Sequence, residues 1–368
     1  MIGLRVPFQH LARRIGPIDA RKIDELEVAT SVLLAILVAH WIGAENVSWA
    51  AFSGYMVMRG HASESFVRGV LRIVGTGVGA LLGLMITPVA EHSLLLASVA
   101  LAVVGGLSLY AAMTAKRSYA WLFVGLTFTM ILLDKLEHPS TSLAGFAQTR
   151  LLEVMAGTAA CVVVSTVSTF TLRRRWPGVR APAARRIGWH PHAARHATQA
   201  AVALLALPAL GRLAHVPELA QSSVTILAAM LVPVTGIGAS GLVPVGWRLL
   251  YRVIGCLAGA ALAAAVLFTA HGSAPVLIIG TLLGVVLGRH IENGKSSVAY
   301  VGTQFTMAIL VTLVPDTYAN AQIGPALDRM TGIVIGTALL LPVLIAWHLL
   351  APGTPTTADV QAAEPGGI

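Results

Sequence analysis

Two arginines inside long apolar stretches are the first candidates for chemistry. Arg72 and Arg252 each follow another arginine, Arg68 and Arg248, by one helical turn. A charge deep in a membrane helix costs about 2.5–3.5 kcal/mol on insertion scales, so such residues usually serve a function. A guanidinium binds a carboxylate through charge-assisted hydrogen bonds. These positions predict a site for a small organic anion; the alternatives are anchoring at the lipid interface or pairing with a nearby carbonyl or acid.

Arg150 and Arg329 each begin a later apolar stretch and are the second pair of candidates. We expect them to line the outer end of a path for the anion. The alternatives are ion pairs, of Arg150 with Glu153 at i,i+3 and of Arg329 with the adjacent Asp328. Intramembrane carboxylates commonly relay protons, so Glu153 is the predicted proton-coupling residue. A structural salt bridge to Arg150 is the alternative role for Glu153.

Two phenylalanines and a set of glycines complete the candidate residues. Phe128 and Phe305 are each followed by Thr–Met and could stack on a flat ligand, with packing in the core as the alternative. Small residues at four-residue spacing allow two helices to approach closely. The glycines predicted to serve helix packing are Gly75, Gly79, Gly83, Gly157, Gly255, Gly259 and Gly336.

The motifs of common enzyme sites are absent from the sequence. It contains no GxxxxGK[ST], HExxH, GxSxG or CxxC. His190, His192 and His196 cluster, but no cysteine or carboxylate joins them as a metal ligand. Cys161 and Cys256 are interpreted as small core residues. We therefore expect no catalytic activity, no cofactor and no metal site.

The composition is that of a membrane protein. Of the 368 residues, 56% are hydrophobic and 11% are charged, and the mean hydropathy is +0.78. Soluble domains have about 25% charged residues, so this chain has too few to cover a water-facing surface. The net charge of +9 does not by itself indicate binding to nucleic acid, and we expect none, because the positions of the arginines matter more than their number.

The chain contains an internal duplication. The stretch RGVLRIVGTGVGALLG over 68–83 reappears as WRLLYRVIGCLAGA over 247–260, with both arginines and two glycines displaced by 180 positions. The pattern Arg–Gly–Thr over 150–158 reappears over 329–337, displaced by 179, and Phe128 reappears as Phe305, displaced by 177. Four matches in one order predict two homologous halves.

Apolar stretches long enough to cross a bilayer, about 20 residues each, recur six times in each half. The predicted spans are 29–45, 47–59, 68–90, 93–115, 118–134, 150–172, 194–214, 221–236, 247–270, 274–290, 297–314 and 329–350. We therefore predict an all-α integral membrane protein with about twelve transmembrane helices in two parallel six-helix repeats. The predicted regions are a cytoplasmic segment 1–28, the first repeat 29–172, a basic cytoplasmic linker 173–193, the second repeat 194–350 and a disordered cytoplasmic tail 351–368.

Basic residues set the orientation of these spans. With the N-terminus inside, only Lys135, Arg150, Arg212 and Arg329 of the 25 lysines and arginines fall at the outer side. Cytoplasmic loops are enriched in lysine and arginine, so both termini are predicted to be cytoplasmic.

The third predicted helix resembles that of the fusaric acid resistance proteins, which belong to the wider aromatic acid exporter family. The resemblance rests on Arg–x–x–Gly–Thr–x–x–Gly over 72–79, on VSWAAFSGYMVM over 47–58 with Trp49, and on the Arg–Gly–Thr pattern over 150–158. It covers roughly residues 25–350. Many such exporters carry a sizeable cytoplasmic domain after each half, whereas the linker here has about 20 residues. The second half departs from the motif, with Cys256 where the first half has a threonine.

The resemblance implies a bacterial inner-membrane exporter of aromatic or other small organic acids, driven by the proton gradient. The expected partners are the organic anion, the lipid bilayer, a periplasmic adaptor protein and further copies in a homo-oligomer. The anion would pass between the halves, with Arg72 and Arg252 receiving its carboxylate from the cytoplasmic side. Two alternatives remain open at this point: a passive organic-anion channel, and a membrane scaffold subunit without transport activity.

Overall fold

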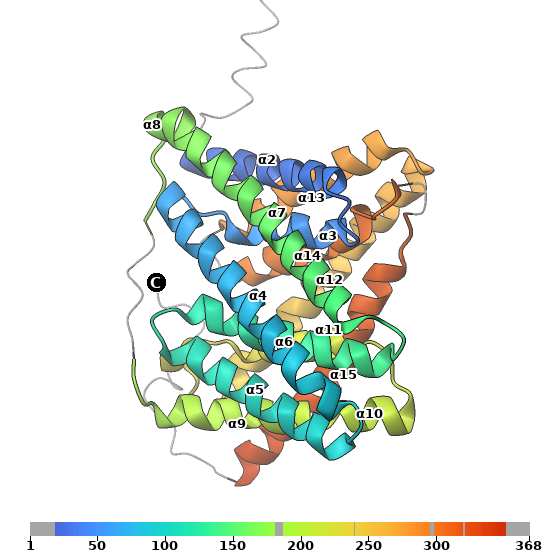
Figure 1. The fold of residues 1–368 in the computed structure, drawn as a ribbon. Coiled ribbons are helices and arrows are strands. Elements are labelled where there is room, and N and C mark those ends of the chain that lie inside the picture. The colour runs from blue at the N-terminus through green and yellow to red at the C-terminus, as the bar shows by residue number, and fades with distance from the viewer. Residues whose placement is uncertain (1–18, 181–186, 239, 295–297, 319–320, 351–368) are drawn as a thin grey trace, which may run out of the picture.

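The structure is a computed structural model that describes residues 19–180, 187–238, 240–294, 298–318 and 321–350. These residues are almost entirely helical and contain no β-strand, as predicted (Figure 1). The first half comprises α2 (Ala20–Trp41), α3 (Val47–Val57), α4 (Ala62–Ala90), α5 (Leu94–Thr114), α6 (Ser118–Glu137), α7 (Leu143–Phe170) and α8 (Leu172–Arg175). The second comprises α9 (Pro191–Leu205), α10 (Leu207–Ala214), α11 (Leu219–Met230), the 3₁₀ turn η1 (Val234–Gly236), α12 (Leu242–Ala270), α13 (Ala274–Glu292), α14 (Ala299–Leu313) and α15 (Gly324–Leu350). The predicted tail 351–368 lies outside the described residues.

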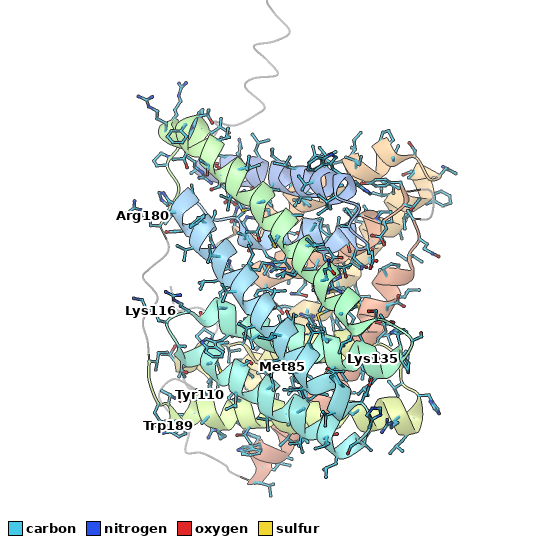
Figure 2. The ribbon with its side chains drawn as sticks, viewed as in Figure 1. Met85, Tyr110, Lys116, Lys135, Arg180 and Trp189 are labelled. Carbon is cyan, nitrogen blue, oxygen red and sulfur yellow. The ribbon has the colours of Figure 1, made fainter. Side chains whose placement is uncertain are left out.

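Eight helical segments among the described residues are long and apolar enough to cross a membrane. They are α4, α5, α6, α7, α9 with α10, α12, α13 and α15. One face of α4 exposes hydrophobic side chains at helical spacing, namely Val70, Val74, Val78, Leu81 and Met85, the last of which is labelled in Figure 2. Such an exposed apolar face needs a lipid or protein cover. The chain is therefore a multi-pass membrane protein.

The short helices differ from the predicted full spans. Helix α3 has 11 residues, α11 has 12 and α14 has 15. At about 1.5 Å per residue, α3 is only about 16 Å long, roughly half the hydrocarbon thickness. Both α3 and α11 instead end inside the bundle, where their side chains face other helices.

Glycines bring α4 into backbone contact with α6. A Cβ atom at Gly79 would lie 2.6 Å from the carbonyl oxygen of Val124 and 2.9 Å from Cβ of Thr127. One at Gly75 would contact the carbonyl oxygen of Ala120. Since real Cβ atoms do not approach other atoms so closely, a side chain at either position would force the helices apart. The remaining predicted glycines also face neighbouring helices: Gly83 faces Ile131, Gly157 faces Ala50, Gly255 faces Val301 and Gly336 faces Ser222.

The contact between α12 and α14 repeats this arrangement with a different register from the predicted one. Gly259 faces the carbonyl oxygen of Phe305, as Gly79 faces that of Val124. The glycines are 180 positions apart and their partners are 181 positions apart. The packing therefore places Phe305 where the first half has Val124. The sequence comparison instead matches Phe305 with Phe128, at an offset of 177 positions. Phe128 lies one turn beyond Val124 on α6.

The two halves of the chain interlock through reciprocal contacts. Helix α5 packs on α9 and α2 packs on α13, while α6 contacts α11 and α3 contacts α14. In Figure 1, α2 lies along the upper edge of the molecule and α9 along the lower edge. Two of the short helices, α11 and α3, start at a carboxylate of the opposite half: Glu137 accepts a hydrogen bond of 2.9 Å from Leu219 N, and Asp316 accepts one of 2.9 Å from Val47 N. Negative charge stabilises a helix N-terminus, so these carboxylates fasten α11 and α3 to the other half.

Helix α2 begins within the segment 1–28, which was predicted to lie outside the first repeat. Asp24 and Glu27 of that segment are buried. Arg289 of α13 donates to Asp24 from Nε at 2.6 Å and from Nη2 at 3.1 Å, and Arg173 donates to Glu27 at 2.5 and 2.8 Å. Pairing between distant helices thus allows a polar stretch to become the start of a packed helix.

We expect Asp24→Asn to lower the free energy of unfolding by about 2–3 kcal/mol, because it removes charge from a buried, hydrogen-bonded ion pair. Burial raises the pKa of Asp24, but the charge and hydrogen bond of Arg289 outweigh burial and leave the pKa below its ordinary value. The stabilisation is therefore present above the ordinary pKa of aspartate and is lost as the pH falls through the lowered value. Thermal unfolding of the purified protein in detergent measures the effect. Glu45→Gln, at an exposed position, is the control and should melt like the wild type.

Candidate functional site

A cavity of about 180 Å³ lies between the two halves of the helix bundle. Its lining residues come from α3, α4, α6 and α7 of the first half and from the end or interior of α11, α12, α14 and α15 of the second. Pockets for drug-sized ligands measure about 300–1,000 Å³. The smaller volume here suits a ligand of about one ring.

Five arginines line this cavity, and four of them are those predicted to bind the anion. They are Arg72, Arg150, Arg248, Arg252 and Arg329. No carboxylate is among its lining residues within the described ranges. A small apolar space surrounded by one sign of charge concentrates ions of the opposite sign. The cavity is therefore suited to a small anion.

Arg72 is held by neutral side chains. It is 1% exposed, and it donates from Nε to Ser53 Oγ at 3.1 Å and from Nη1 to the Tyr119 hydroxyl at 3.2 Å. The guanidinium carbon lies 4.2 Å from the ring centre of Phe123 and 4.8 Å from that of Phe52. Cation–π contacts of this kind stabilise a buried cation without neutralising it.

Arg252 occupies the matching place in the second half but makes fewer contacts. It is 2% exposed and donates from Nη1 to the Tyr300 hydroxyl at 3.2 Å. Its Nε atom is buried and has no hydrogen-bond partner among the described residues, and the same is true of Nε of Arg248. An unpaired buried donor costs about 1–3 kcal/mol, so both atoms mark places where an acceptor would bind favourably.

Tyr119 and Tyr300 were not predicted as site residues. The hydroxyl of Tyr119 accepts from Arg72, and that of Tyr300 accepts from Arg252. Each ring also makes a cation–π contact with a second arginine: the Arg68 guanidinium carbon lies 3.7 Å from the ring centre of Tyr119, and that of Arg248 lies 4.3 Å from the ring centre of Tyr300. The tyrosines are 181 positions apart, which is the register of α6 with α14. That register would have identified them in the sequence, whereas the offset of 177 did not.

The ion pair predicted for Arg150 is present. Its Nη1 atom lies 3.4 Å from Glu153 Oε2, and its guanidinium carbon lies 4.0 Å from the ring centre of Trp49. Glu153 is fully buried, and its Oε1 atom accepts a hydrogen bond of 3.0 Å from the backbone N–H of Asn46. Glu153 does not line the cavity itself, but it contacts Arg150, which does. Glu153 also caps the start of α3 through its bond with Asn46 N.

Arg329 does not form the alternative ion pair with Asp328. It donates from Nη2 to Gln304 Oε1 at 3.0 Å and from Nε to Cys256 Sγ at 3.4 Å. Asp328 lines a different cavity. Cys256 is buried, as expected of a core residue, yet it also orients a cavity arginine.

Phe128 and Phe305 lie away from the cavity. Phe128 is fully buried in the packed core, and Phe305 is 8% exposed and packs near Gly259 of α12. The aromatic side chains that do line the cavity are Trp49, Phe52, Phe123, Phe146 and Tyr300. Aromatic faces and arginines together form a site for a ligand that is both flat and negatively charged.

A second cavity, of about 490 Å³, adjoins the first. The two share the lining residues Ser48, Trp49, Gln221 and Val311. Unlike the first, the second cavity is acidic, with Glu218, Asp316 and Asp328 in its walls. Trp49 and Gln221 thus stand between an arginine-rich space and an acidic one.

Comparison with known proteins adds a relationship to these features. The p-hydroxybenzoic acid efflux pump subunit AaeB of Escherichia coli O9:H4 (strain HS) is 28% identical over 143 residues. The aligned region covers 36% of this chain and 22% of that relative, so the chain matches only about a fifth of its length. No solved structure shows a significant match. Residues 26–204, from within α2 to within α9, match the fusaric acid resistance protein family.

Proposed function

We propose that this protein exports small aromatic carboxylates across the bacterial inner membrane and couples this export to the proton gradient. The observation that carries the proposal is the cavity between the halves, which is lined by five arginines and five aromatic side chains, with no carboxylate among its described lining residues. The match to the fusaric acid resistance family and to a p-hydroxybenzoic acid efflux pump subunit supports the same class of substrate.

We further propose that the chain crosses the membrane twelve times as two parallel six-helix repeats, with both termini cytoplasmic. The short helices α3 and α11 would each complete their crossing with the non-helical residues that follow them. Three observations support this arrangement. Helices α4 and α12 both have 29 residues, the glycine contacts of α4 with α6 recur in α12 with α14, and the halves exchange reciprocal contacts. Figure 2 labels Arg180 and Lys116 at one edge of the molecule and Lys135 towards the opposite edge, in agreement with the predicted sides. The first six-helix repeat would then extend from residue 29 to 172 and the second from 194 to 350.

In this mechanism the arginines hold the anion and Glu153 carries the proton. The carboxylate of the substrate reaches the unpaired donors of the cavity from the cytoplasmic side. Protonation of Glu153 weakens both its ion pair with Arg150 and its bond to Asn46 N. Two contacts hold Trp49 in place: its ring stacks on Arg150, and its helix α3 begins at Asn46. Protonation of Glu153 weakens both of these contacts. Trp49 stands between the two cavities, so its release opens the path from the central cavity to the acidic one.

Flux of labelled 4-hydroxybenzoate into proteoliposomes of the purified protein tests the function. We expect accumulation above equilibrium when a pH gradient is imposed, and none in liposomes without protein. Equilibration without accumulation would indicate a passive organic-anion channel. No flux of 4-hydroxybenzoate or of other aromatic acids would refute the transport proposal and favour a scaffold subunit. The word subunit in the relative's name supports a partner in export, for which a periplasmic adaptor protein is our proposal.

Glu153→Gln should abolish the response of flux to the pH gradient while retaining equilibration of the substrate. The amide keeps the size of the side chain and an acceptor for Asn46 N, but it cannot carry a proton. Uptake at several imposed pH gradients measures this, with Glu45→Gln at an exposed position as the matched control. A Glu153→Gln protein that still accumulates substrate in proportion to the gradient would exclude Glu153 as the coupling residue.

A further inference from the structure

We infer that the substrate lies in the cavity in one orientation, with its carboxylate at Arg248 and Arg252 of the second half and its ring against the aromatic wall of the first half. This inference rests on the proposed function, because it assigns places to the two ends of the same substrate. It also adds Arg248 to the four arginines that the sequence predicts to bind the anion.

The position of the substrate's carboxylate is inferred from the unpaired Nε donors of Arg248 and Arg252. Arg248 and Arg252 are one turn apart on α12, so their side chains share one face of the helix. Arg248 donates from Nη2 to the carbonyl of Ala228 at 3.2 Å, and Arg252 donates from Nη1 to Tyr300. Both Nε atoms are buried without a partner among the described residues, and both arginines line the cavity. A carboxylate has two oxygens and can accept a hydrogen bond from each.

The matching arginines of the first half already have partners for Nε. Arg68 donates from Nε to the carbonyl oxygen of Met56 at 3.0 Å, and Arg72 donates from Nε to Ser53 Oγ at 3.1 Å. Rings of Phe52 and Phe123 also lie over the Arg72 guanidinium. Arg68 is not a lining residue of the cavity. The duplicated arginine pairs are therefore unequal, and the second-half pair is the one with free donors.

The other two arginines of the cavity are also engaged. Arg150 is paired with Glu153, so its charge is largely compensated. Arg329 donates to Gln304 and to Cys256. Nη1 of Arg150 is also buried without a hydrogen-bond partner among the described residues, but the Glu153 carboxylate lies 3.4 Å from it. Arg248 and Arg252 have unpaired donors side by side, and no carboxylate is among the described lining residues of the cavity, which leaves the anion subsite at α12.

The position of the substrate's ring is inferred from the difference in polarity between the first-half and second-half walls of the cavity. A Cβ atom at Gly75 would lie 3.0 Å from Cβ of Phe123, and one at Gly255 would lie 2.8 Å from Cβ of Gln304. Phe123 and Gln304 therefore occupy matching places on α6 and α14, one aromatic and the other polar. Trp49, Phe52 and Phe146 extend the aromatic wall of the first half, whereas Tyr300 is the aromatic residue of the second-half lining. A ring gains by contact with the first-half wall.

The test compares two equivalent arginines with two ligands of the same charge. Isothermal titration of the purified full chain in detergent would measure the Kd of benzoate and of cyclohexanecarboxylate for Arg248→Gln and Arg68→Gln. We expect Arg248→Gln to raise the Kd of both ligands by about 10-fold or more, because it removes a donor to the carboxylate. Arg68→Gln should stay within about twofold of the wild type. Arg248→Lys, which keeps the charge but lacks Nε, should also weaken both ligands and serves if the glutamine variant does not fold.

A fourth variant tests the position of the ring. Phe123→Leu keeps an apolar side chain but removes the aromatic face, so the preference for benzoate over cyclohexanecarboxylate should fall about 2- to 10-fold. Equal losses in Arg68→Gln and Arg248→Gln would overturn the orientation while leaving the proposed function intact. An unchanged preference in Phe123→Leu would overturn the ring position. If the wild type neither binds nor transports any organic acid, the proposed function fails, and the orientation fails with it.

Discussion

Arg252→Gln is expected to reduce gradient-driven uptake of an aromatic carboxylate by about 100-fold in kcat/KM. The guanidinium is 2% exposed and lines the cavity between the halves. Removing one partner of a buried, hydrogen-bonded charge pair typically costs 2–5 kcal/mol or more, and a factor of 100 corresponds to about 2.7 kcal/mol. Uptake of labelled 4-hydroxybenzoate at several concentrations into proteoliposomes measures the loss.

Two further variants make this expectation specific. Arg117→Gln removes an equal charge at an exposed position and should transport like the wild type. Arg72→Gln should raise the half-saturating concentration by a smaller factor, since Nε and Nη1 of Arg72 already bond Ser53 and Tyr119. If Arg252→Gln transports as well as Arg117→Gln does, then Arg252 has a purely structural role and the anion site lies elsewhere.

Gly79→Leu is expected to lower the free energy of unfolding by about 3 kcal/mol or more. Even the first side-chain carbon would lie 2.6 Å from the Val124 carbonyl oxygen, which belongs to a helical backbone and cannot move alone. Overpacking a close contact typically costs 1–3 kcal/mol, and leucine adds three more carbons to the clash. The melting temperature in detergent and the yield of folded protein should both fall.

Gly77 of the same helix provides the control. A Cβ atom at Gly77 would have no atom within 4 Å of it, so Gly77→Leu should be tolerated. It should even stabilise α4 slightly, because leucine has the higher helix propensity. Gly259→Leu should reproduce the large effect in the second half, where the Phe305 carbonyl faces the glycine. Equal melting temperatures for Gly79→Leu and Gly77→Leu would show that the close contact does not limit stability.

The sequence by itself determined the membrane class, the all-helical fold and four of the five arginines that meet at the cavity. Hydropathy acts residue by residue, so 11% charged residues among long apolar runs exclude a water-facing surface whatever the topology. The duplicated arginines stand out for a similar local reason: an unscreened charge in an apolar stretch is costly, and a second copy 180 positions later is unlikely to arise by chance.

Contacts between distant residues required the tertiary structure. The burial of Asp24 depends on Arg289, a residue 265 positions away, and no local pattern predicts that pairing. The same holds for Tyr119, whose role appears only when α6 is placed against α4. Aligning Phe128 with Phe305 gave the wrong register between α6 and α14. Phe305 faces Gly259, whereas the residue that faces the matching Gly79 is Val124, so identical residues in the two halves do not have the same neighbour.

The difference between the duplicated arginines is the clearest example of what tertiary structure alone decided. In the sequence, Arg68 with Arg72 and Arg248 with Arg252 are equivalent in type and spacing. In the fold, the carbonyl of Met56 and the hydroxyl of Ser53 satisfy Nε of the first pair, and nothing in the described residues satisfies Nε of the second. Hydrogen-bond satisfaction depends on which helix packs beside each donor, and that is a property of the assembled bundle rather than of the motif.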